Sequence, residues 1–293
     1  MDRTWITKLM SGEGSNHSNL RKHILAIHES NPGFTENCGH SFKNKSEKSS
    51  YQWLAQIIEP KKHKKILDLA CGSGPLLEIC DDLYGQDISL IGVDMSSPEL
   101  KLASRRLKNT KISLINSTAQ DLNFISDKDI DVVLCHWALT LMSPVEPVLR
   151  EIKRVLKNRG IFGAIIDGNN SLSPQYEKVH SIIYSWAKKQ YPNYGSVELG
   201  DTRIREPKKL ITLIKEIFID VYVEIEHDIL ELKAEPEKLA KEVSGFFYAA
   251  LILNKTNKKN MLLELQKFFI SQKTNRRVLS FQMPINRLIV TKK

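Results

Sequence analysis

The sequence predicts an α/β fold in which a largely parallel sheet carries helices on both faces. Short apolar segments alternate with longer amphipathic segments within the 293-residue chain, as strands alternate with helical crossovers in parallel sheets. Strands are expected near residues 65–69, 89–93, 111–115, 130–135 and 160–166.

Helices are expected before, within and after this core. Two are predicted at residues 18–31 and 47–60, with a polar loop between them. Residues 143–146 read Ser-Pro-Val-Glu, which predicts a capping box and a first-turn proline for a helix that ends near Leu156. Beyond residue 170 the pattern predicts helices at about 174–191, 207–216, 236–254 and 257–272, an edge or hairpin strand at 219–227, and a last strand at 286–290.

The most informative stretch is the turn that follows the first strand. Asp68 lies between two leucines there, and a buried carboxylate is costly unless a ligand or backbone amides satisfy it. Gly72 and Gly74 allow the backbone to approach a ligand closely. The second strand ends in Asp94, where an acid usually binds the two hydroxyls of a ribose. These residues predict an adenosine-containing cofactor.

A dinucleotide is the less favoured cofactor, because its fingerprint needs a third glycine that allows the helix to pack closely on the strand. The frame from Gly72 reads Gly-Ser-Gly-Pro-Leu-Leu, so the third glycine is absent. A dehydrogenase, which would bind NAD in preference, therefore remains an alternative with weaker support.

The turn resembles the first motif of the class I S-adenosylmethionine-dependent methyltransferases, E/D-x-G-x-G-x-G. Asp68, Gly72 and Gly74 match this pattern, and Ala70 replaces its first glycine. Four further segments resemble later motifs of the family in the same order, and together they cover roughly residues 60 to 170. These segments are residues 92–96, 116–122, 130–137 and 148–160.

The resemblance implies a Rossmann-like sheet of seven mostly parallel strands, with the last strand antiparallel. It also implies three parts of the chain. Residues 1–60 would form an N-terminal helical cap segment, and residues 61–170 the S-adenosylmethionine-binding core. Residues 171–293 would supply helical insertions on the acceptor side and the closing strands of the same domain.

The cofactor implied is S-adenosylmethionine, with S-adenosylhomocysteine as its product. By resemblance, Asp94 binds the ribose, Met95 lies on one face of the adenine, and Asp121 accepts from the adenine amino group. Asp121 could instead be a solvated turn residue, and Cys71 a small buried side chain. The full set of expected cofactor-binding residues is Asp68, Ala70, Cys71, Gly72, Gly74, Asp94, Met95, Gln120, Asp121, Leu122, Cys135 and His136.

His136 is the candidate catalytic base, because it lies at the carboxyl end of the fourth strand, where open α/β sheets bind their ligands. A binding role or a purely structural role is open for the same histidine. Candidate substrate-binding residues are Tyr51, Trp137, Arg203 and Arg205, of which the arginines could pair with an acidic acceptor.

Motifs that the chain lacks exclude several classes of methyl acceptor. The chain lacks the Asn/Asp-Pro-Pro-Tyr/Phe tetrapeptide of enzymes that methylate amino groups of DNA bases or glutamine, and it has no Pro-Cys dipeptide. Residues 134–142 contain no carboxylate that could hold the metal of a catechol-type enzyme. We therefore expect a metal-independent transferase that acts by in-line displacement on an O, N or C nucleophile of a small molecule.

Composition sets the remaining expectations. The chain is 41% hydrophobic and 26% charged, without a signal-peptide core, a membrane-length apolar segment or a C-x-x-C pair, which favours a cytoplasmic protein. The net charge of +9 invites a nucleic-acid partner, but the lysines are scattered and no RNA-binding module accompanies them. An RNA or protein methyltransferase and a non-catalytic S-adenosylmethionine-binding relative remain the alternatives.

Overall fold

A computed structural model describes residues 17–109, 111–195, 199–272 and 279–293 of the chain. The chain divides into two compact units. Unit 1 comprises Met1–Ser49, Gly168–Glu198 and Ile229–Pro284, and unit 2 comprises Ser50–Asp167, Leu199–Asp228 and Ile285–Lys293. The functional division at residues 60 and 170 stays a prediction, and the first 16 residues of its cap segment lie outside the described part of the chain.

The sheet has seven strands in the order β3-β2-β1-β4-β5-β7-β6. Pairing is parallel from β3 through β5, and β7 is antiparallel to β5. The predicted α/β sheet of seven mostly parallel strands with an antiparallel last strand is therefore confirmed. The strands are β1 Lys65–Leu69, β2 Ser89–Asp94, β3 Ser113–Asn116, β4 Ile130–His136, β5 Leu156–Asp167, β6 Val221–Ala234 and β7 Leu279–Lys292.

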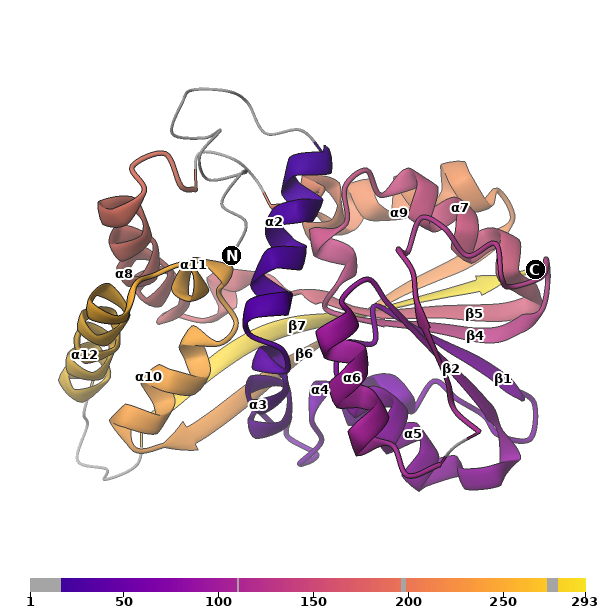
Figure 1. Ribbon diagram of the computed structural model, residues 1–293, viewed down its shortest axis with the longest axis horizontal. Coiled ribbons are helices and arrows are strands. Elements are labelled where there is room, and N and C mark those ends of the chain that lie inside the picture. Colours follow the sequence, from indigo (N-terminus) through magenta and orange to yellow (C-terminus); the bar gives the residue numbers. More distant parts are fainter. Residues whose placement is uncertain (1–16, 110, 196–198, 273–278) are drawn as a thin grey trace. The chain divides into compact units, whose positions relative to one another are not determined.

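Helices cover both faces of the strands in unit 2. In Figure 1, α5 and α6 lie on one side of the parallel strands, and α7 and α9 lie on the other. Strands β1 and β4 are buried on both faces, which explains why they are nearly continuous apolar runs. The helices of this unit are α4 Ser50–Ala55, α5 Pro75–Tyr84, η1 Gly85–Asp87, α6 Ser97–Arg106, η2 Leu139–Leu141, α7 Glu146–Val155, η4 Thr202–Arg205 and α9 Pro207–Phe218.

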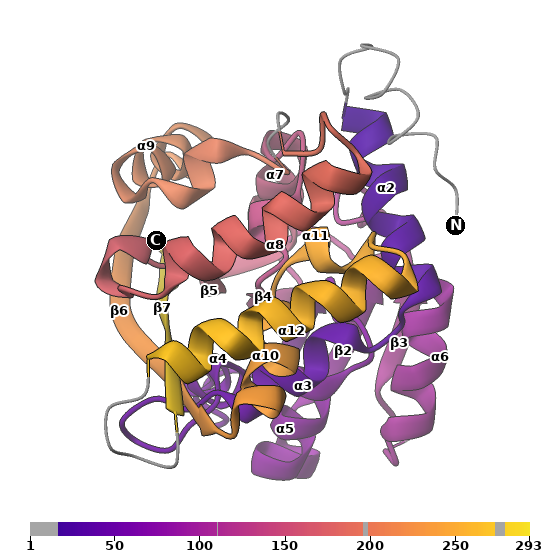
Figure 2. The same ribbon diagram turned by 90° about the vertical axis from the view of Figure 1, so that its left-hand side faces the viewer.

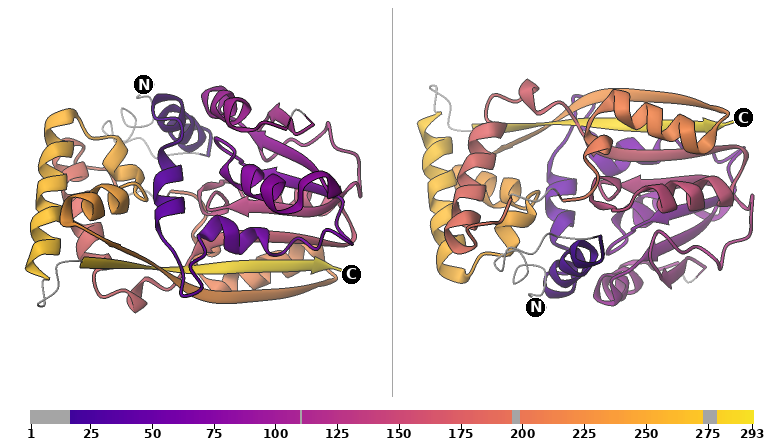
Figure 3. Two further views of the ribbon diagram at one scale, coloured as in Figure 1. Left: turned by 90° about the horizontal axis from the view of Figure 1, so that it is seen from below. Right: turned by 90° about the horizontal axis from the view of Figure 1, so that it is seen from above.

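Unit 1 is mainly helical. Its helix α12 packs against α8 and α10, and Figure 2 shows α8 and α12 side by side. Neighbouring strands β6 and β7 (Figure 3, orange and yellow) supply residues to both units. No helix in the described ranges is long and apolar enough to cross a membrane. The helices are α2 His17–Ser30, α3 Phe34–Ser41, η3 Asn170–Leu172, α8 Tyr176–Gln190, α10 Pro236–Ser244, α11 Tyr248–Leu251 and α12 Lys255–Ser271.

The predicted capping box at residues 143–146 is wrong. Helix α7 begins at Glu146, and the residue before it, Val145, makes no side-chain capping bond. A start at Ser143 would have placed Pro147 beyond the first turn, where its missing N–H removes a helical hydrogen bond. The later start brings this proline into the first turn, where no N–H partner is needed.

Three other helical segments differ from the prediction. The segment between the first two predicted helices contains α3, and the helix expected at residues 47–60 is confined to α4. The helix expected at 236–254 ends at Ser244, and a separate turn, α11, follows. Gly245 follows Ser244, and glycine is among the weakest helix formers, so the break falls where propensity is lowest.

Candidate active site

The β1–α5 turn is a tight left-handed loop. Ala70, Gly72 and Gly74 have φ angles of 60°, 53° and 82°, a region that glycine enters freely and alanine enters at about 1–2 kcal/mol. A methyl group at position 74 would also lie 3.1 Å from the Cβ of Ala103 on α6. The loop therefore needs Gly74 both for its conformation and for close packing, whereas Ala70 carries strain.

Asp68 is the most unusual side chain in this region. It is 2% exposed, and neither carboxylate oxygen has a hydrogen-bond partner. Burial, with a smaller contribution from the nearby charge of Asp94, raises the pKa of Asp68 to about 8. In the same loop the hydroxyl of Ser73 is buried and likewise unpaired. Unsatisfied buried polar atoms are rare, so these two residues fit a loop that is completed by a polar ligand.

Asp94 lies at the end of β2 and holds the loop from the other side. Its Oδ2 accepts from the backbone N–H of Gly72 and its Oδ1 from that of Ser96, both at 2.8 Å. The two oxygens of a carboxylate offer about four acceptor positions, so one carboxylate can accept from several donors at once. Glu99 is not among the predicted site residues, yet it is 1% exposed and lies under this loop, 3.9 Å from where a Cβ of residue 72 would be.

The loop after β3 carries the predicted adenine contacts. Asp121 is exposed, and its Oδ1 accepts weakly from Asn123 N–H at 3.4 Å. The loop is anchored one residue later, where the backbone N–H of Leu122 donates to Glu151 of α7 at 2.9 Å. Arg154 binds Glu151 and the carbonyl oxygen of Leu122, which fixes this anchor further.

The predicted cofactor residues differ in what their side chains can reach. Met95 and Gln120 are half-buried. Leu122 and Cys135 are completely buried core side chains, so a ligand could meet only their backbone. Burial raises the pKa of Cys135 to about 12, which makes this thiol a poor nucleophile.

At the carboxyl end of β4, the side chains of Ser50, Tyr51 and Trp137 surround His136. The ring of Tyr51 stacks on the imidazole with 3.7 Å between centroids, and Trp137 meets it edge-on at 5.3 Å. The Nε2 of His136 is hydrogen-bonded to the hydroxyl of Ser50 at 2.8 Å. Trp137 has a φ of 53°, which is unusual for a bulky residue and typical of functional sites. The structure thus brings His136, Tyr51 and Trp137 together, and their roles in catalysis and substrate binding stay predictions.

Arg203 and Arg205 are occupied by protein acids. Arg203 binds Asp201 through two nitrogens and Glu146 through one of them. Arg205 pairs with Asp167 at 3.4 Å and donates to a backbone carbonyl. These contacts favour a structural role, and their predicted binding of an acidic acceptor stays untested.

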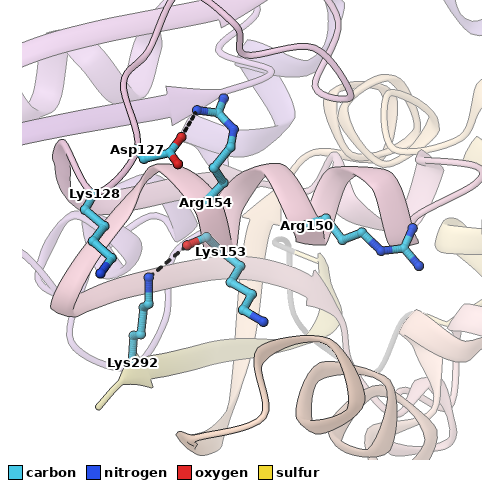
Figure 4. Close-up of a pocket in the computed structure, with 6 residues that line it drawn as sticks. All are labelled: Asp127, Lys128, Arg150, Lys153, Arg154 and Lys292. Carbon is cyan, nitrogen blue, oxygen red and sulfur yellow. Dashed lines mark hydrogen bonds and ion pairs between the residues drawn. The ribbon is translucent and has the colours of Figure 1, made fainter.

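A basic pocket of about 250 Å³ lies at the opposite, amino-terminal end of β4 and β5 (Figure 4). Its Lys292 amine donates to the carbonyl oxygens of Lys153 and Leu156 at 3.0 and 2.8 Å, and so caps the end of α7. Burial, with smaller contributions from the nearby charges of Lys128 and Lys153, lowers the pKa of Lys292. The pocket is lined by Asp127, Lys128, Arg150, Lys153, Arg154 and Lys292.

Comparison with known proteins points to a methyltransferase domain, the class of protein that the fold and the β1–α5 loop also indicate. Residues 67–164 match a family model described as a methyltransferase domain. This match includes the β1–α5 turn, Asp94, the loop after β3 and His136.

Two curated relatives match the same part of the chain. The demethylmenaquinone methyltransferase of Symbiobacterium thermophilum is 36% identical over 121 residues, 40% of this chain and 47% of the relative. The 2-phytyl-1,4-naphtoquinone methyltransferase of Synechococcus elongatus is 32% identical over 123 residues, 40% of this chain and 52% of the relative. The match spans about half the length of each.

Among solved structures, the YcgJ protein of Bacillus subtilis superposes with a TM-score of 0.56 at 16% identity, covering 83% of this chain and 98% of that protein. At this identity the likeness concerns the fold alone. Residues 67–164, about a third of the chain, are thus similar to a methyltransferase domain, and the sheet that contains them has the fold of the solved neighbour.

Proposed function

We propose that this chain moves a methyl group from S-adenosylmethionine to a nucleophile of a small, ring-bearing molecule in the cytoplasm. The observation that carries the proposal is the left-handed loop after β1 with the unpaired, buried Asp68 and Ser73 beside it. A ligand with a cationic amino group and hydroxyls would satisfy these atoms, which is the chemistry of the amino-acid and ribose parts of the cofactor.

The cofactor, when bound, supplies a methyl group on a positively charged sulfur. The chain's own contribution would be to bind and orient. Asp94 would accept from the ribose hydroxyls while it continues to hold Gly72, and Met95 and Asp121 would contact the adenine. Asp68 would accept from the amino group, which would draw its carboxyl back to the ionised form.

At the acceptor side, the half-buried ring of Trp137 would offer flat apolar surface to a ring-shaped acceptor. Tyr51, which is 4% exposed, would hold the imidazole of His136 by stacking on it. The names of the two relatives specify quinone compounds, which supports an aromatic acceptor here. His136 would take the proton that an acceptor hydroxyl must lose before a carbon or oxygen attacks the methyl group. Transfer would need no metal, because alignment and exclusion of water supply the rate gain.

Calorimetry with S-adenosylhomocysteine tests the central claim. The wild type should bind, and Asp94→Ala should bind at least about tenfold more weakly, the equivalent of one lost charged hydrogen bond. Asp82→Ala removes an exposed acid from α5 and is the matched control. Absence of binding to the wild type would overturn the proposal.

Acceptor class is tested by incubating the protein with labelled S-adenosylmethionine and a metabolite extract. Label in a small aromatic product supports the proposal, and label only in RNA or protein contradicts it. The basic pocket with Lys128, Arg150 and Lys292 is the feature that favours RNA as the second candidate. RNA binding there should weaken steeply with salt and should be lost in Arg150→Glu.

A further inference from the structure

Three lysine side chains gather at the amino-terminal end of β4 and β5, within unit 2. Lys128 precedes β4, Lys153 lies in the last turn of α7, and Lys292 is the last residue of β7. In Figure 4 their amines lie below α7, whereas Asp127 and Arg154 meet above it. The three amines therefore line one part of the pocket of about 250 Å³.

Protein acids do not neutralise these amines. Within the described part of the chain, no acid forms an ion pair with any of the three. Asp127 pairs with Arg154 at 2.9 Å. Asp220, in the same region, pairs with Lys293 at 2.8 Å. Positive charges that no protein acid matches create a local field that attracts anions.

The amines also keep hydrogen-bond donors that the protein does not use. An ammonium group has three N–H donors. Lys153 donates to the carbonyl oxygen of Ile217 at 2.8 Å, and Lys292 donates to two carbonyl oxygens at the end of α7. These bonds leave Lys153 two donors and Lys292 one.

The backbone holds Lys128 beside the pocket. Its N–H donates to the carbonyl oxygen of Arg154 at 2.9 Å, and the N–H of Asp129 donates to that of Val155 at 2.8 Å. The φ of Lys128 is 53°, a conformation that persists only where the surrounding structure holds it. The two bonds also satisfy carbonyl oxygens at the end of α7, which would otherwise disfavour an anion.

We propose that Lys128, Lys153 and Lys292 bind the phosphate group of a small ligand. Three positive charges suit the charge of about −1.5 to −2 on a phosphate monoester at pH 7 better than the single charge of a carboxylate. The pocket is smaller than the roughly 300–1,000 Å³ of sites that enclose a whole small molecule. It would therefore hold the phosphate group and leave the rest of the ligand outside.

A single phosphate group fits this end of the sheet better than the backbone of an RNA. Lys65, at the start of β1, pairs with Asp129. Lys157, near the start of β5, pairs with Asp131 at 2.8 Å. RNA binds along a stripe of cations, whereas these pairs concentrate the unmatched charge at the three amines.

Calorimetry of the full chain with inorganic phosphate, at constant ionic strength, tests the proposal. The wild type should bind phosphate and should not bind acetate. Lys128→Met should weaken phosphate binding about tenfold, the equivalent of one lost charged hydrogen bond. Lys101→Met removes an exposed lysine from α6, is the matched control, and should bind phosphate as the wild type does.

Vesicles distinguish the two sources of the phosphate group, and both outcomes support the site. A lipid headgroup predicts that the wild type sediments with vesicles that contain phosphatidic acid and that Lys128→Met does not. A ligand in solution predicts that neither protein sediments with them.

Three results would overturn the proposal. The first is a wild type that does not bind phosphate or that binds acetate equally well. The second is equal affinity for phosphate in Lys128→Met and Lys101→Met. The third is binding of a single-stranded RNA oligonucleotide by a wild type that does not bind phosphate. S-adenosylhomocysteine binding is independent of all three, because the pocket lies at the end of the strands opposite the β1–α5 turn.

Discussion

The buried carboxyl of Asp68 should make the unliganded protein less stable as the pH rises. Its pKa is about 8 in the folded chain, against about 3.9 for an unperturbed aspartate. Between these values the folded state holds a proton that the unfolded state has released, so the free energy of unfolding falls with rising pH. The stabilising effect of the protonated carboxyl is at its full value below the pKa of Asp68 in the unfolded chain. Its loss with rising pH is complete near pH 8.

The magnitude follows from the size of the shift. Each pH unit within this window costs about 1.4 kcal/mol, so the loss at pH 7 is on the order of 4 kcal/mol. This is a large share of the 5–15 kcal/mol by which domains are typically stable. Asp68→Asn keeps the shape of the neutral carboxyl and cannot ionise, and so it should remove the whole dependence on this group.

Urea unfolding of both proteins without ligand, followed by tryptophan fluorescence at pH 5 to 9, measures the effect. The free energy of unfolding of the variant, relative to that of the wild type, should rise by about 1.4 kcal/mol per pH unit from pH 5 to 8. Above pH 8 the difference should be constant. Asp82→Asn controls for the loss of an acid at an exposed position. A difference between Asp68→Asn and the wild type that does not change with pH would refute the argument, because Asp68 would then be ionised or hydrated in the native state.

Three further substitutions test the supports of the site. Gly92→Ala should lower the free energy of unfolding by about 1–3 kcal/mol in urea titrations, since the new methyl group would lie 2.6 Å from Leu77; an unchanged midpoint would contradict this. Glu151→Gln should cost about 1–2 kcal/mol and weaken binding of S-adenosylhomocysteine, because Glu151 accepts from Leu122 N–H. The bond with Arg154 is the main cause of the lowered pKa of Glu151, so this stabilisation should disappear as the pH falls below the usual range of glutamate, and equal acid sensitivity of variant and wild type would count against it. Lys292→Met should lower the melting temperature through a loss of about 1 kcal/mol, while cofactor binding should stay as in the wild type.

The sheet was predictable because its signals are local. Each core strand is a short apolar run between polar turns, and β1 was predicted to the residue. The antiparallel direction of the last strand followed from the family resemblance and from nothing in the strand itself. Helix α7 shows the limit of local rules, since the pattern at residues 143–146 predicted a capped start that the structure does not use, and the helix begins at Glu146 with Pro147 in its first turn.

The site was predictable only in part, since its members differ in how they are recognised. Asp68 and Asp94 lie at strand ends, where position alone marks them. Ser73 carries no motif of its own, and Glu99 is marked only as part of a helix start, so the place of both beside the loop appears only when burial is known. The contact of Ser50 with His136 joins distant segments, and a single sequence contains no information on which serine will meet which histidine.

The two ends of the parallel strands differ in whether their charged side chains have hydrogen-bond partners. At the amino-terminal end, Asp131 accepts from Lys157 and from the backbone of Lys64 and Lys65, and Lys292 donates to two carbonyls. At the carboxyl-terminal end, Asp68 is buried and neither of its carboxylate oxygens has a hydrogen-bond partner. A folding sequence under no other demand would satisfy both ends alike, because an unpaired buried acid costs several kcal/mol. This uncompensated cost supports the proposed role of Asp68, in which a bound ligand pairs with the acid.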